Sequence, residues 1–149
     1  MSNAMRVLIV EARFYDDIAD ELAAGAIAAV EAAGGTVERV QVPGALEIPA
    51  AIQMAEDGDL EHFDAYVALG CVIRGETSHY DYVCGESARG LMDIALFSNV
   101  ALGNGILTVE NREQAWARAD RAQKNKGRDA AEAAMAMAAL KQRFFGESA

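Results

Sequence analysis

The stretch FDAYVALG, residues 63–70, decides the fold. After Asp64 it is continuous in apolar residues, which is typical of a strand whose two faces are both buried. RVLIVEA, residues 6–12, is a second short run rich in apolar and β-branched residues. Strands buried on both faces belong to parallel sheets covered by helices, so the sequence favours an α/β fold.

Helical and strand patterns alternate outward from these two runs. Further strands are expected at 36–42 and at 100–109, the latter despite two glycines. Helices are expected within 15–35, from a turn at 43 to 57, over 79–98, over 113–122 after a capping box at Asn111 and Gln114, and over 127–144. This order predicts a three-layer α/β sandwich with a four-stranded parallel sheet. Residues 5–149 form one predicted domain, and MSNA at 1–4 is interpreted as an expression scar.

Composition excludes several classes of function. The formal charge of −10 argues against a nucleic-acid or anionic-membrane partner. No signal peptide or membrane-spanning run is recognised, and the two cysteines have no disulfide spacing, which predicts free thiols in the cytoplasm. Metal-ligand spacings, a Walker loop and a dinucleotide fingerprint are also missing from the sequence.

In a parallel sheet, ligands bind beyond the carboxyl ends of the strands. The four segments expected there are EARFYDD, VPGALEIP, CVIRGETSHYDY and LTVENREQ. In the third, Ser78 followed by Asp81 predicts a helix N-terminus near His79. The amides of Glu76 and Thr77 then form an anion site, and His79 is placed for proton transfer. A surface histidine beside an ordinary helix cap fits the same spacing.

For other candidate residues, a structural and a functional interpretation both remain open. Phe14 fits a core residue or an aromatic lid over a flat ligand. Glu47 fits a hydrogen-bond acceptor for ligand hydroxyls or a solvated residue of a first helical turn. Arg118 belongs to a basic cluster that fits a solvated helix face or a phosphate contact. For Cys71 and Cys84, inert packing is the preferred interpretation.

Five stretches resemble the lumazine synthase family: RFYDDIADELAAGA, VPGALEIPAA, ALGCVIRGETSHYDYVCGESARGL, GNGILTVENREQAWARA and NKG. The resemblance runs from Arg6 to Phe144. It implies a flavodoxin-like sheet and a transferase of riboflavin biosynthesis that uses no metal and no organic cofactor. The implied reaction condenses 5-amino-6-(D-ribitylamino)uracil with 3,4-dihydroxy-2-butanone 4-phosphate to 6,7-dimethyl-8-ribityllumazine. The implied assembly is a homopentamer with sites between neighbouring subunits.

The resemblance also implies roles for single residues. His79 matches the general acid/base, and Phe14 matches the aromatic that stacks on the pyrimidine. Arg118 matches a phosphate-binding arginine supplied by the adjacent subunit, and Lys126 a lysine near the same pocket. The remaining matches are ribityl contacts at Ala45, Leu46 and Glu47, pyrimidine contacts at Cys71, Val72 and Ile73, and the phosphate turn at Glu76 and Thr77.

Three departures from the family pattern stand out. Asn104 replaces an aromatic residue that many relatives contribute across the interface, and Tyr15 replaces a common asparagine. Many relatives also carry an extra N-terminal strand before the first strand here. Because that strand helps shells to close, we expect an isolated pentamer or a pair of pentamers.

Two other functions fit parts of the pattern. One is a carrier or sensor that binds a lumazine or flavin without turnover. The other is an archaeal-type riboflavin synthase on a related scaffold, which the motifs match less well.

Overall fold

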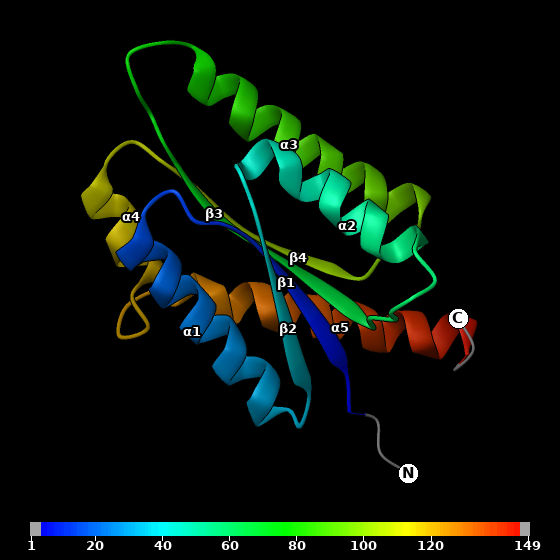
Figure 1. The fold of residues 1–149 in the computed structure, drawn as a ribbon. Coiled ribbons are helices and arrows are strands. Elements are labelled where there is room, and N and C mark those ends of the chain that lie inside the picture. The colour runs from blue at the N-terminus through cyan, green and yellow to red at the C-terminus, as the bar shows by residue number, and fades with distance from the viewer. Residues whose placement is uncertain (1–3, 147–149) are drawn as a thin grey trace.

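Four strands pair in parallel in the order β2-β1-β3-β4, as the computed structural model of the chain shows (Figure 1). The structure describes residues 4–146, so most of the expected scar at 1–4 lies outside the described residues. The elements are β1 Arg6–Ala12, α1 Asp16–Ala32, β2 Thr36–Val42, the 3₁₀ turn η1 Ala45–Glu47, α2 Ile48–Asp57, β3 Ala65–Ile73, α3 His79–Phe97, β4 Leu102–Val109, α4 Arg112–Ala119 and α5 Lys126–Phe145. The predicted flavodoxin-like α/β sandwich is confirmed.

The two faces of the sheet carry two separate cores, because successive strand residues point in opposite directions. Val7 and Ile9 of β1 pack with α1, α4 and α5 on one face. Leu8 and Val10 pack with Ile48 of α2 and with α3 on the other. Figure 1 shows the same division, with α1 and α5 on one side of the strands and α2 and α3 on the other.

The glycines of β4 have a packing role. A Cβ atom at Gly103 would lie 1.8 Å from the carbonyl oxygen of Ala130, and one at Gly105 would lie 3.0 Å from the Ala130 side chain. Helix α5 therefore lies directly against the backbone of β4, which its alanine-rich face permits. These contacts explain why a strand with two glycines survives here.

Some predicted boundaries are wrong. Strand β3 covers 65–73 instead of 63–70, so Cys71, Val72 and Ile73 belong to the strand. Helix α4 ends at Ala119 instead of 122, because Asp120 accepts hydrogen bonds from the Ala122 amide and from Gln123. None of the helices within residues 4–146 has the length and apolar character needed to cross a membrane.

Candidate active site

The carboxyl ends of β1, β2 and β3 bring most of the candidate residues to one edge of the sheet. β1 and β2 end at the same level, where Ala12 lies opposite Val42. Phe14 follows β1, and η1 with Ala45, Leu46 and Glu47 follows β2 and contacts β3. Cys71, Val72 and Ile73 form the end of β3 itself. Phe14 and η1 follow the strand ends as predicted, whereas Cys71, Val72 and Ile73 lie within β3.

Phe14 is presented to solvent instead of being buried in the core. Its side chain is 78% exposed, and its ring lies edge-on to that of Tyr15, with the two ring centroids 4.8 Å apart. An exposed aromatic ring beyond the end of a central strand is available to a flat ligand. The geometry therefore removes the alternative that Phe14 is a core residue of the isolated chain.

The η1 turn offers a mixed surface. Ala45 is buried, whereas Leu46 and Glu47 are exposed. Because Glu47 has no ion-pair partner within the part of the chain that the structure describes, its carboxylate is available to hydrogen-bond donors.

Cys71 and Tyr15 lie together beneath this edge, where they help to line a small cavity that also contacts Glu11. Burial raises the pKa of the Cys71 thiol to about 11, so the thiol is protonated at neutral pH. Burial also raises the pKa of Tyr15. A protonated, partly buried thiol is a poor nucleophile, which agrees with the packing role expected for Cys71.

The turn between β3 and α3 arches away from the sheet before α3 begins (Figure 1). Within residues 4–146 the backbone amides of Glu76 and Thr77 donate to no acceptor, so both are available to a ligand. His79 is the first residue of α3, and its side chain is exposed. The turn thus carries two free N–H groups beside the positive end of a helix.

The predicted cap at Ser78 is wrong in detail. Ser78 has φ −74° and ψ 1°, not the extended backbone of a capping residue, and its side chain makes no capping hydrogen bond. Instead, the His79 amide donates to the Thr77 hydroxyl at 3.2 Å. In contrast, Asn111 caps α4 as expected, since its side chain accepts from the Gln114 amide at 2.9 Å.

Arg74 connects α3 to the segment after β4, a role that the sequence analysis did not predict. Its Nε donates to Glu110 at 2.8 Å, and its Nη1 lies 3.6 Å from the Asp81 carboxylate. Its guanidinium also lies 4.3 Å from the centre of the Tyr80 ring. The start of α3 is therefore tied to the ends of β3 and β4.

A second group of candidates lies along the outer edge of β4. Asn104, Arg118 and Lys126 line a hollow of about 340 Å³ there, and the candidates from the ends of β1, β2 and β3 do not line it. Arg118 is half-buried and donates to the carbonyl of Gln114 at 3.1 Å, but it has no carboxylate partner within residues 4–146. The Lys126 ammonium lies 3.5 Å from Asp129.

Asn104 is engaged in its own strand. Its side-chain oxygen accepts from the Ile106 amide at 2.9 Å, on the edge of β4 that pairs with no other strand in residues 4–146. A side chain that satisfies an edge amide has a local structural role. Among the described residues no three His, Cys, Asp or Glu side chains converge to hold a metal ion.

Comparison with known proteins agrees with the resemblance seen in the sequence. The family model described as 6,7-dimethyl-8-ribityllumazine synthase matches residues 4–142. The chain is 61% identical to 6,7-dimethyl-8-ribityllumazine synthase 1 of Rhizobium meliloti, covering 96% of this chain and 95% of the relative. It is 58% identical to the Bartonella bacilliformis synthase, over 93% and 91%, and 59% identical to that of Agrobacterium fabrum, over 94% and 97%. The chain therefore belongs to the 6,7-dimethyl-8-ribityllumazine synthase family.

Proposed function

We propose that this chain condenses 5-amino-6-(D-ribitylamino)uracil with 3,4-dihydroxy-2-butanone 4-phosphate to form 6,7-dimethyl-8-ribityllumazine, phosphate and water. The observation that carries the proposal is the family match, which extends over residues 4–142. This match makes the chain a transferase of riboflavin biosynthesis.

The pyrimidine substrate is assigned to the ends of β1, β2 and β3. The exposed ring of Phe14 stacks on the pyrimidine, and the backbone at Cys71, Val72 and Ile73 contacts the pyrimidine edge. η1, with Ala45, Leu46 and Glu47, holds the ribityl chain. The exposure of the Glu47 carboxylate supports this role, because it is available to accept from hydroxyl groups.

The phosphate of the second substrate is assigned to the turn before α3. The unpaired amides of Glu76 and Thr77 provide neutral donors, and Arg118 provides charge. Such donors hold the substrate phosphate and stabilise it as a leaving group. An acidic chain can thus bind a phosphorylated substrate in a locally positive pocket. Lys126, beside Arg118, adds a second cation to this pocket.

His79 is assigned the proton transfers. Attack of the substrate amine on the ketone with loss of one water, elimination of phosphate, and ring closure with loss of a second water each require protons to move. A histidine at the mouth of the site supplies general acid/base catalysis worth about 10²–10⁴-fold. Alignment of the two substrates contributes a separate share of the rate.

Two groups of candidates that do not share one hollow support a site completed by a neighbouring chain. In this arrangement Arg118, Lys126 and Asn104 of one copy face the Phe14 and His79 side of the next. Self-association has independent support from α3, whose large exposed apolar side chains are Tyr82, Met92, Leu96 and Phe97. We assign the homopentamer that the resemblance to the family implies.

The test is turnover. The purified protein, given both substrates, is expected to form the fluorescent lumazine and inorganic phosphate in equal amounts. Chelator in the assay should leave the rate unchanged. Tight binding of the lumazine with no formation from the two substrates would instead support the carrier or sensor function.

A further inference from the structure

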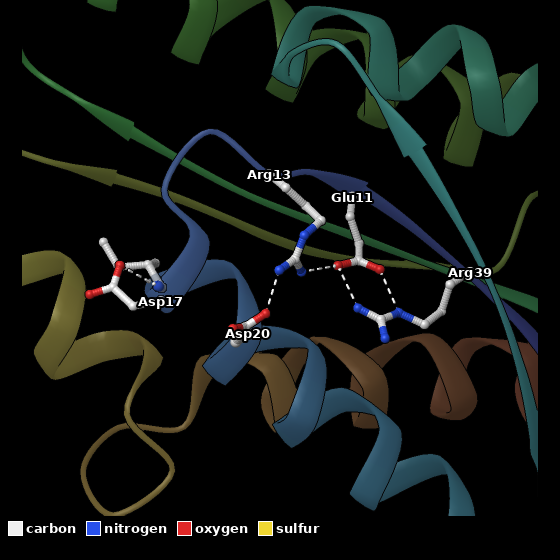
Figure 2. Close-up of polar contacts among 6 residues, drawn as sticks. Glu11, Arg13, Asp17, Asp20 and Arg39 are labelled. Atoms are coloured by element: carbon white, nitrogen blue, oxygen red, sulfur yellow. Dashed lines mark hydrogen bonds and ion pairs between the residues drawn. The ribbon is translucent and has the colours of Figure 1, made fainter.

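Glu11 is a buried carboxylate that has no part in the site described so far. It lies at the end of β1 and is 3% exposed. Arg39 of β2 donates to it twice, from Nε at 2.6 Å and from Nη2 at 3.0 Å, and Arg13 donates from Nη1 at 2.9 Å (Figure 2). One carboxylate thus organises two arginines. Because charge-assisted bonds of this kind fix geometry, the position of Arg13 depends on Glu11.

Arg13 extends this network into the next helix. Its other terminal nitrogen, Nη2, donates to the Asp20 carboxylate of α1, so the guanidinium bridges β1 and α1 (Figure 2). The bridge spans the turn between the two elements, and Phe14 is the residue that directly follows Arg13. We use the name Glu11 clamp for Glu11, Arg13, Asp20 and Arg39.

The clamp also lies against the underside of the turn. Glu11 and Tyr15 line the same small cavity, together with Cys71. Tyr15 in turn supports the edge-on contact with the Phe14 ring. Phe14 itself is 78% exposed, so few contacts of its own hold it in place. The position of its ring is therefore set by the backbone of the turn and by Tyr15.

Burying the Glu11 carboxylate is a costly way to stabilise a fold, because this charge loses its hydration, whereas Arg39 and Asp20 remain partly exposed. At the end of a central strand, beside the expected pyrimidine site, the same network has a second use. It fixes the backbone from which an exposed ring projects, and this reduces the entropy lost when a ligand stacks on that ring.

We propose that Glu11 is a positioning residue for the pyrimidine substrate, which it affects by holding Arg13 and the turn that presents Phe14. The proposal rests on the proposed function in one respect, the stacking role of Phe14. Glu11 itself does not contact the substrate and transfers no proton.

The experiment is a double-mutant cycle with Glu11→Gln and Phe14→Ala, in which kcat and both KM values are measured. Glutamine keeps the size of the side chain but removes the charge that both arginines share. We expect Glu11→Gln to raise the KM for the ribitylaminouracil about tenfold, while the KM for the butanone phosphate changes less than about twofold. In a Phe14→Ala background the same change should alter the pyrimidine KM less than about twofold, because the two residues act as one unit.

Glu21→Gln is the matched control. Glu21 lies on α1 and accepts from the guanidinium of Arg121 at 3.2 Å and 3.1 Å, so the substitution removes a comparable partner from a different arginine. It should leave both KM values unchanged. If Glu11→Gln fails to fold, Asp20→Asn takes its place in the cycle. Asp20 is exposed, and its substitution removes only the ion pair between Arg13 and α1.

Each outcome decides a separate point. If Phe14→Ala raises the pyrimidine KM but the clamp variants behave like Glu21→Gln, the positioning role is wrong and the stacking role stands. If the clamp variants raise the KM equally with and without the Phe14 ring, Glu11 does not act through Phe14. If Phe14→Ala leaves the pyrimidine KM unchanged, the stacking assignment fails, and the positioning role fails with it.

Discussion

Replacing Arg118 with alanine tests the proposed phosphate pocket. Arg118 is half-buried at the edge of β4, where its guanidinium donates to the Gln114 carbonyl at 3.1 Å. Within residues 4–146 it has no carboxylate partner, so its charge is not neutralised inside the chain. The substitution therefore removes a cation without leaving a buried anion behind, and we expect the fold to tolerate it.

The magnitude follows from the bond that is lost. A hydrogen bond to a charged group contributes about 1.5–3 kcal/mol. This corresponds to a rise of about 10- to 150-fold in the KM for the butanone phosphate. The KM for the pyrimidine substrate should stay within about twofold, because Arg118 is assigned to the phosphate alone.

The assay follows lumazine fluorescence while each substrate is varied in turn. Arg121→Ala is the control, since the Arg121 guanidinium is already bonded to Glu21 at 3.2 Å and 3.1 Å. It should leave both KM values near those of the unmodified protein. The reasoning is refuted if Arg121→Ala weakens phosphate-substrate binding as much as Arg118→Ala, or if Arg118→Ala acts only on the pyrimidine.

Three further predictions follow from single residues. His79→Ala should lower kcat by about 10²-fold or more with little change in either KM, and initial rates measured while each substrate is varied in turn will separate kcat from KM. Gly103→Ala should destabilise the fold by about 3 kcal/mol, because its Cβ would lie 1.8 Å from the Ala130 carbonyl oxygen. Gly85→Ala is the control, because a Cβ there meets open space, and it should be neutral or stabilising. Thermal denaturation measures both variants. The pKa of Cys71 is raised from 9.0 to about 11, so between these pH values the unfolded thiol loses its proton while the folded thiol keeps it, and stability should fall as pH rises. Cys71→Ser should reduce that alkaline loss, and an equal loss in both proteins would show that the thiol is not its source.

The fold was predictable because the apolar runs are long and unambiguous. Residues 7–12 and 65–69 are buried on both faces, as their nearly continuous apolar sequence indicates. The strand with two glycines was harder, because the reason for Gly103 and Gly105 lies in the approach of α5. That approach is a tertiary contact, and local propensity contains no information about it.

The predicted end of helix α4 was wrong because a side chain there replaces a backbone hydrogen bond of the helix. Asp120 ends α4 by accepting from the amide of Ala122, a bond that competes with continuation of the helix. The capping box at Asn111 was predicted correctly, since both of its side chains lie within one local motif. Its second partner differs in detail, because Gln114 accepts from the Glu110 amide at 2.8 Å instead of the Asn111 amide.

The location of the candidate site follows from the strand order, but its division into two groups does not. Residue patterns beyond the strand ends indicate Phe14, Glu47 and His79, but only the family resemblance predicted that Arg118 lies apart from them, in the hollow beside β4. The Glu11 clamp was also missed, because Glu11 and Arg39 are 28 residues apart and meet only through the pairing of β1 with β2. Such cross-strand pairs depend on register, which a single sequence does not specify.

A mixed assembly tests the central claim, that His79 of one chain and Arg118 of another complete each site. His79→Ala and Arg118→Ala chains, carrying different tags, are produced together, and mixed oligomers are assayed at a butanone phosphate concentration far below the variant KM. In a ring with sites between neighbours, about a quarter of the sites regain both intact residues, so the activity of the mixture should exceed that of either variant alone. Activity no higher than the mean of the two separate variants would contradict the shared site.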